Sequence, residues 1–216
     1  MSIKKNLLNL KSKLPHNISL VAVSKTKPIS DLEQAYQTGQ RLFGENKVQE
    51  MVHKYEIMPK DIKWHMIGHL QRNKVKYIAP FVNLIHGVDS LKLLKEISKQ
   101  ALKCDRTIDC LFQLKIASEN TKFGMSKNEL QTILNCDEFK KLKYIKGRGV
   151  MGMASFTGDF DKIKLEFKYL KSIFDDLKNQ FQEFKIISMG MSGDYELAIK
   201  CGSNMIRIGS HIFGSR

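Results

Sequence analysis

Short runs rich in β-branched residues alternate with longer amphipathic segments along most of the chain. Between residues 91 and 101, for example, apolar side chains recur at spacings of three and four, as they do on one face of a helix. This alternation is typical of parallel strands connected by helices. We predict eight strands, at residues 19–24, 41–44, 64–68, 82–88, 109–116, 149–154, 185–190 and 205–209.

Eight strand–helix units are the number that an α/β fold of the (β/α)8 TIM-barrel type requires, and 216 residues lie near the lower end of its usual range. An open doubly wound sheet is the alternative, although it seldom needs eight strands at this length. An amphipathic segment, Ile3 to Leu14, precedes the first strand and is stopped by Pro15. No Pro-, Gly- or Ser-rich linker interrupts the chain. We therefore expect one TIM-barrel domain over residues 1–216 with an extra N-terminal helix.

The formal charge of +14 permits attraction to nucleic acid or to anionic membranes. The lysines are dispersed through predicted helices without interleaved aromatic residues, which indicates a solvated surface and no specific nucleic-acid site. No apolar stretch reaches the roughly 18 residues that a membrane span needs, and the N-terminus lacks a signal-peptide core. We expect a cytoplasmic protein that does not associate with membranes.

Cysteine and histidine spacing gives no metal or redox motif. The four cysteines are widely scattered, so we expect reduced and mostly buried thiols. His65 and His69 have a spacing that binds metal on a helix, but this pair is predicted to straddle a strand and a loop. We expect no metal site.

Lys25 closes the apolar run from Ile18 to Ser24. In a barrel the carboxyl ends of the strands carry the active site, and a lysine there can form a Schiff base with an aldehyde. The alternative is an ordinary strand-end lysine in solvent.

Turns with glycine and serine follow the predicted seventh and eighth strands, at 188–194 and 207–210. TIM barrels often bind phosphate with these two loops, where glycine lets the backbone approach an anion closely. Either turn alone is ordinary loop chemistry, but together they indicate a phosphate site.

A lysine facing a phosphate site implies a ligand with an aldehyde and a phosphate, and pyridoxal 5′-phosphate carries both groups. Arg207 precedes Gly209 by two residues and shares its face of the strand. Its guanidinium could hydrogen-bond the pyridine nitrogen and keep that nitrogen unprotonated. A structural ion pair inside the barrel is the alternative for Arg207.

Six stretches in order along the chain resemble the pyridoxal phosphate homeostasis proteins: 21–28, 43–46, 64–68, 70–74, 188–192 and 207–214. The resemblance implies a barrel like the N-terminal domain of alanine racemase, with Lys25 carrying the cofactor as an internal aldimine. It also implies that Asn46 contacts the cofactor ring and that Arg207 faces the pyridine nitrogen. The implied phosphate contacts are Ser192, Gly209 and Ser210.

Other positions carried over by the resemblance are less specific. Met191 would form part of the cavity wall. His65 would line the barrel mouth, with a core histidine as the equal alternative. His69 stands where the family has a proline, and Lys115 stands where a neutral polar residue is usual. Both departures change the expected charge around the mouth.

The function implied is intracellular homeostasis of pyridoxal phosphate. A monomer would buffer the cofactor and deliver it to apo-enzymes without robust amino-acid turnover, because no second domain supplies an acid/base on the opposite face. The alternative is an amino-acid racemase, for which Tyr195 is the candidate base. Charge alone leaves a nucleic-acid-binding role open. A phosphosugar enzyme would need a carboxylate base, and no convincing candidate stands at the strand ends.

Overall fold

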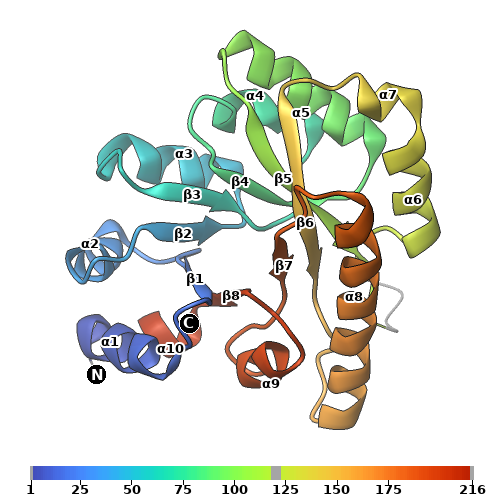
Figure 1. Ribbon diagram of the computed structural model, residues 1–216. Coiled ribbons are helices and arrows are strands. Elements are labelled where there is room, and N and C mark those ends of the chain that lie inside the picture. Colours follow the sequence, from blue (N-terminus) through green and yellow to red (C-terminus); the bar gives the residue numbers. More distant parts are fainter. Residues whose placement is uncertain (1, 118–122, 215–216) are drawn as a thin grey trace.

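A closed barrel of eight parallel strands forms the centre of the computed structural model, which describes residues 2–117 and 123–214 (Figure 1). Each strand pairs with the next one along the chain, and the last strand pairs with the first through Ser19–Met205 and Val21–Arg207. The strands are β1 (Ser19–Val23), β2 (Leu42–Glu45), β3 (Lys63–Met66), β4 (Leu84–Val88), β5 (Ile108–Leu114), β6 (Ile145–Gly152), β7 (Ile186–Ser188) and β8 (Met205–Ile208). The predicted TIM-barrel class is confirmed.

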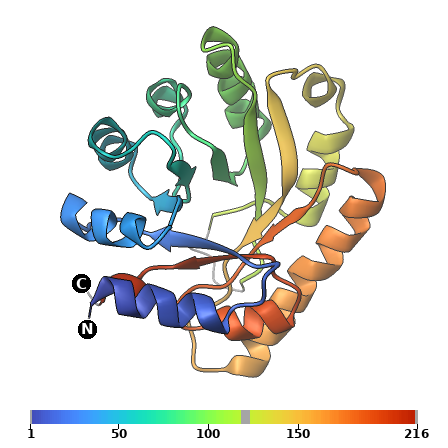
Figure 2. The ribbon, with the colours of Figure 1, turned by 60° about the vertical axis from the view of Figure 1, so that its left-hand side comes forward.

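Helices surround this barrel, as Figures 1 and 2 show. Several begin at a serine whose side chain caps the first turn, such as Ser90, whose hydroxyl accepts from the backbone N–H of Leu93. The helices are α1 (Ile3–Lys13), α2 (Ile29–Gln37), α3 (Val48–Ile57), the 3-10 turn η1 (Arg72–Lys74), α4 (Val75–Ile78), α5 (Leu91–Lys103), α6 (Lys127–Asn135), α7 (Asp137–Lys140), α8 (Phe160–Gln180), α9 (Tyr195–Lys200) and α10 (Ser210–Phe213).

The predicted extra N-terminal helix is α1, and it lies beside α10 at the other end of the sequence (Figures 1 and 2). The side-chain amide of Asn6 donates to the carbonyl of Ile212 at 3.1 Å. Leu7 is fully buried in the outer core. The two ends of the described chain are therefore held together by packing and by a hydrogen bond.

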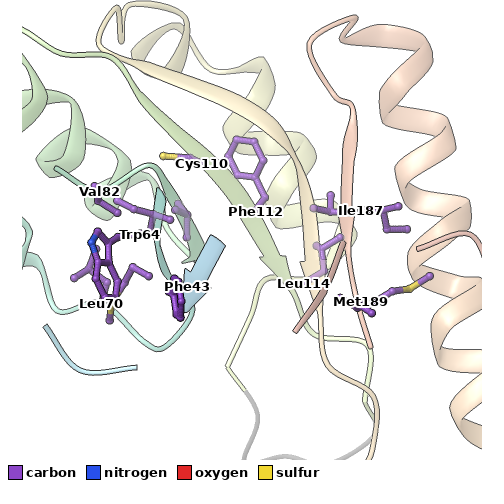
Figure 3. Packing of buried hydrophobic residues seen from close by; sticks show 14 of the residues in the cluster. Phe43, Trp64, Leu70, Val82, Cys110, Phe112, Leu114, Ile187 and Met189 are labelled. Atoms are coloured by element: carbon purple, nitrogen blue, oxygen red, sulfur yellow. The ribbon is translucent and has the colours of Figure 1, made fainter. Parts of the chain in front are cut away.

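Alternation along the strands separates two apolar regions. Side chains on the outer faces pack against the helices in one large cluster, part of which Figure 3 shows around Trp64 and Phe112. A smaller cluster fills the barrel interior. Its buried members are Val21, Leu84, Leu111, Met151 and Met205. Because these side chains fill the lower interior, a cavity has room only towards the carboxyl ends of the strands.

The main boundary difference is in β6, which begins at Ile145 instead of at residue 149. Lysine, arginine and glycine fill the first part of this strand and hide its β pattern. A bulge also interrupts the pairing of β5 with β6, between Cys110 and Leu111. Gly149 adopts φ +145° at this bulge.

Two further expectations concern the burial of the cysteines and membrane-spanning helices. All four cysteines are unpaired, but only Cys110 is fully buried; Cys104, Cys136 and Cys201 are half-buried, so the expectation of mostly buried thiols is wrong. Within residues 2–117 and 123–214, no helix is long and apolar enough to cross a membrane.

Replacing Gly149 with alanine should lower the free energy of unfolding by more than about 2 kcal/mol, because the new methyl group would clash with backbone in a strained conformation. A Cβ at this position would lie 1.8 Å from the carbonyl oxygen of Ile186. Gly158→Ala is the matched control, since a Cβ there meets no atom within 4 Å. Urea unfolding checks both variants, and equal stabilities would contradict the geometry.

Candidate functional site

A cavity of about 650 Å³ opens at the carboxyl ends of the strands. Its wall includes residues from the loops after β1, β2, β3, β7 and β8, together with two methionines and two phenylalanines. Seven of the sequence-predicted residues line it: Lys25, Asn46, Met191, Ser192, Arg207, Gly209 and Ser210. Residues that are up to 185 positions apart in the sequence, Lys25 and Ser210, thus meet around one space.

Lys25 lies in a tight turn directly after β1. The backbone N–H of Lys27 donates to the carbonyl of Ser24 at 3.0 Å and closes the turn. Thr26 adopts φ +64°, a left-handed conformation that is uncommon for a β-branched residue. Its backbone N–H donates to the carboxylate of Glu50 at 2.6 Å. This turn therefore holds the lysine backbone at the edge of the cavity in a strained conformation.

A buried charge network beneath this turn supports it. The ammonium of Lys54 donates to the carbonyl of Ser24 at 2.7 Å and to the carboxylates of Glu45 at 2.8 Å and Glu50 at 2.7 Å. The Ser24 hydroxyl also donates to Glu45, at 2.6 Å. Glu45 is fully buried, and its second carboxylate oxygen has no hydrogen-bond partner among the described residues. Burial raises the pKa of Glu45, and Lys54 opposes that rise.

Sequence reasoning missed this network. Glu45 belongs to a stretch that resembles the family, but Lys54 lies in the middle of α3 and gave no signal of its own. The available signal was the spacing of Glu50 and Lys54, which places both side chains on one face of a helix.

The turn after β7 contains two glycines, of which Gly193 lines the cavity. Gly190 adopts φ +100°, and a Cβ on Gly193 would meet no atom within 4 Å. The N–H of Met191 already donates to the carboxylate of Asp194 at 2.6 Å, so Met191 offers the cavity a wall and not a donor. Ser192 lines the cavity beside it. The space over this turn can accept an anion's oxygen atoms close to the main chain.

The turn after β8 follows the strand next to β7. Gly209 brings this turn close to β1, because a Cβ here would lie only 3.2 Å from the carbonyl oxygen of Val23. Ser210 begins the short helix α10 and also lines the cavity. Gly209, Ser210 and Ser192 all line the cavity, and their binding of a phosphate stays a prediction.

Arg207 lies at the base of the cavity and is 4% exposed. Its guanidinium donates to the carbonyl of Ser188 at 3.0 Å, to the hydroxyl of Ser188 at 2.6 Å and to the carbonyl of Gly152 at 3.1 Å. Burial lowers the pKa of Arg207 to about 10, whereas the charge of Asp194 raises it. The structure thus places a protonated guanidinium inside the barrel, held mainly by neutral oxygen atoms.

His65 is not among the residues that line the cavity. Its side chain is buried inside the barrel, where its Nδ1 lies 3.0 Å from Nε2 of His86. Ile67, two residues further along the same face, lines the cavity instead. The expectation that His65 lines the mouth is corrected: this histidine lies below the mouth, in the barrel interior.

The structure also gives the positions of the two departures from the family pattern, His69 and Lys115, and of the candidate racemase base, Tyr195. His69 lines the cavity, stacks on Phe123 and lies 3.5 Å from the carboxylate of Asp89, whereas Lys115 is absent from the lining. Tyr195 is buried outside the cavity lining, and its hydroxyl donates to Glu196 at 3.1 Å. No group of three or more metal-binding side chains occurs in the described part of the chain.

The donor set fits pyridoxal phosphate on chemical grounds. A lysine amine, an amide side chain, a guanidinium and two small hydroxyl-bearing turns line one cavity. An aldehyde needs the amine, a phosphate needs close backbone and hydroxyl donors, and an unprotonated ring nitrogen needs a donor such as arginine. The residues present therefore fit the aldehyde, the phosphate and the ring nitrogen of this cofactor.

The sequence is similar to one protein family and to several relatives. The profile of the family "Alanine racemase, N-terminal domain" matches residues 1–216. A pyridoxal phosphate homeostasis protein of Pasteurella multocida is 35% identical over 231 aligned positions, which cover 100% of this chain and 98% of the relative. One from Schizosaccharomyces pombe is 37% identical over 93% of this chain and 85% of its own length.

Solved structures agree. PipY of Synechococcus elongatus without PLP has a TM-score of 0.92 at 33% identity, covering 98% of this chain and 100% of PipY. The structure of PipY with PLP bound has a TM-score of 0.89 at 31% identity with the same coverage. An alanine racemase of Clostridium difficile, at 16% identity and a TM-score of 0.79, covers 100% of this chain and 57% of its own and shares the fold alone.

Replacing Lys54 with methionine should lower the free energy of unfolding at about pH 7 by about 3 kcal/mol, because it leaves the Glu45 charge buried without its partner. Without the ammonium, the pKa of Glu45 rises further, and the folded state binds a proton more tightly than the unfolded state. Stability then falls as the pH rises through this range, so the loss should be smaller at about pH 5.

Urea unfolding at both pH values checks this prediction. Lys95→Met is the matched control, because Lys95 pairs with Glu138 on the surface, where both side chains are well exposed. It should cost less than about 1 kcal/mol at either pH. A Lys54→Met loss that is the same at both pH values would contradict the role of the Glu45 charge.

Proposed function

The chain belongs to the pyridoxal phosphate homeostasis proteins, within the alanine racemase N-terminal domain family, and we propose that it binds pyridoxal 5′-phosphate at the barrel mouth through Lys25. The observation that carries the proposal is the meeting of Lys25, the two glycine–serine turns and Arg207 around one cavity. Its relative PipY, whose fold it shares, has a structure with PLP bound.

Different residues of the chain bind different groups of the cofactor. The amine of Lys25 attacks the cofactor's aldehyde, a C=N bond forms, and water leaves. Ser192, Gly209 and Ser210 bind the phosphate, and Asn46 contacts the ring. Met191 forms part of the wall. Arg207 donates a hydrogen bond to the pyridine nitrogen, since a guanidinium has only donors and stays protonated at neutral pH.

Arg207 is also a reason to expect no robust amino-acid turnover. When bound, pyridoxal phosphate supplies an electron sink for substrate carbanions, and a protonated ring nitrogen strengthens that sink. An arginine donor keeps this nitrogen unprotonated and weakens the sink. Racemisation also needs an acid/base on the face opposite the lysine, and the Tyr195 hydroxyl is bonded to Glu196 away from the cavity lining.

A reversible C=N bond at an open barrel mouth suits buffering and delivery. Hydrolysis of the bond regenerates the lysine amine and the free aldehyde, which apo-enzymes that use the same cofactor can take up. We place this activity in the cytoplasm, in a monomer formed by one domain over residues 1–216. The strands of the closed barrel come from the whole length of the described chain, which supports the single domain.

Protein mixed with pyridoxal phosphate should show the visible absorption band of a lysine Schiff base, and Lys25→Ala should lose it completely, because the band requires the C=N bond. Lys27→Ala is the matched control: Lys27 also lines the cavity, but its amine donates to the carbonyl of Phe213 at 3.1 Å. Absorption spectra of the three proteins check this. A band that survives in Lys25→Ala, or is lost in Lys27→Ala, would contradict the assignment of Lys25.

The racemase alternative is tested by turnover. The loaded protein should racemise alanine and other amino acids at far less than roughly 1 per second, the lower end of ordinary enzymatic rates. Chiral chromatography of the amino acid after incubation measures this rate. Turnover at or above that value would overturn the carriage function and favour the racemase.

A further inference from the structure

A row of hydrogen bonds connects Arg207 to the interior of the barrel and continues towards its far end. The Ser188 hydroxyl, which accepts from the Arg207 guanidinium at 2.6 Å, lies 3.2 Å from Nδ1 of His86. Nε2 of His86 lies 3.0 Å from Nδ1 of His65. His65 also bonds the side chain of Asn83, an exposed residue just before β4. We name these groups, Arg207–Ser188–His86–His65–Asn83, the barrel relay.

The barrel relay crosses the barrel. His65 and His86 come from the neighbouring strands β3 and β4, whereas Ser188 and Arg207 come from β7 and β8. Strands β4 and β7 are not neighbours in the closed sheet, so the contact of His86 with Ser188 spans the interior. Both histidines and Ser188 are buried, with exposed fractions of 2% or less.

The chemistry of arginine fixes the direction of these hydrogen bonds. A guanidinium only donates, so the Ser188 oxygen is an acceptor towards Arg207. Among the described residues, the hydroxyl proton of Ser188 then has one other hydrogen-bond partner, Nδ1 of His86, and is donated to it. The opposite direction would leave that proton buried without an acceptor, which is costly.

The same direction continues through both rings. With Nδ1 of His86 accepting, its Nε2 carries the proton and donates to Nδ1 of His65. Because Nδ1 of His65 accepts, the proton of this ring lies on Nε2, and His65 also hydrogen-bonds the side chain of Asn83. Both histidines are therefore neutral and protonated on Nε2. Burial agrees with this state, since it lowers the pKa of His65 to about 3 and that of His86 well below its usual value.

This direction also stabilises the buried cation. Every lone pair in the barrel relay points towards Arg207 and every proton points away from it, so the bond dipoles add along the row. Aligned hydrogen bonds in a medium of low dielectric constant offset part of the desolvation cost of the guanidinium. The direct partners of Arg207 are otherwise the carbonyls of Ser188 and Gly152.

We propose that His86, acting through Ser188 and backed by His65, is a positioning residue that holds the Arg207 guanidinium charged and oriented towards the cavity before any cofactor arrives. Its consequence for the ring nitrogen rests on the proposed binding of pyridoxal phosphate. Cofactor can then enter and leave a site whose buried guanidinium is already hydrogen-bonded. This suits a protein that releases its cofactor to others.

The first test needs no cofactor. Long-range ¹H–¹⁵N NMR of the protein labelled at histidine nitrogen distinguishes the two neutral tautomers. Between about pH 8 and about pH 5, the His65 and His86 signals should stay those of the neutral Nε2–H form. His65→Gln and His86→Gln assign the two signals. A proton on Nδ1 of either ring, or titration of either ring in this range, would overturn the direction of the barrel relay.

The second test measures what the barrel relay does for the cofactor. His86→Leu should raise the pyridoxal phosphate concentration needed for half-saturation by roughly tenfold, the scale of one lost buried hydrogen bond. It should also shift the pH dependence of the absorption band. His86→Gln should restore most of the affinity, because its amide can still accept from Ser188 and donate to His65. Leu84→Ala is the matched control, a buried residue on the same face of β4 without polar groups.

The outcomes separate the two proposals. If Leu84→Ala shifts affinity and band as much as His86→Leu, or if His86→Gln restores nothing, the effect is general packing and the positioning role is wrong. If the native protein forms no band at all, the cofactor function fails, and the NMR result alone then decides the tautomers and direction of the barrel relay.

Discussion

The site depends on keeping charged groups ionised inside a barrel from which water is largely excluded. A guanidinium away from solvent loses its hydration, and the fold must replace it with oriented oxygen atoms. Arg207 obtains two carbonyls and the hydroxyl of Ser188, whose other partner is His86. The polar residues at the base of the cavity are therefore one electrostatic unit with the barrel interior beneath them.

The same constraint acts at the neighbouring strand β1, which pairs with β8. Beneath the turn that carries Lys25, the Lys54 ammonium donates hydrogen bonds to two carboxylates and a carbonyl. The strained φ of Thr26 persists because Glu50 accepts its backbone N–H. The chain thus uses buried charge both beneath the turn after β1 and at Arg207 to fix backbone and side-chain positions.

Much of this arrangement could be predicted from the sequence, because the relevant rules are local or belong to the fold. Strand periodicity gave the barrel, and the barrel rule then placed Lys25 and the glycine–serine turns at one end. Contacts across the barrel have no local signal: nothing in the chain pairs His86 with Ser188, 102 residues apart. The position of His65 differs from the prediction because alternation gives the face of a strand but not the depth along the barrel. Strand β6 begins earlier than predicted because glycines and lysines mask the β pattern of its first residues.

Borohydride reduction of the protein mixed with pyridoxal phosphate, followed by peptide mass spectrometry, tests the central claim most directly. Reduction converts the reversible C=N bond into a stable amine and marks the lysine that formed it. The account predicts a single cofactor adduct on the peptide containing Lys25. An adduct spread over surface lysines, or located on another lysine of the cavity, would contradict it.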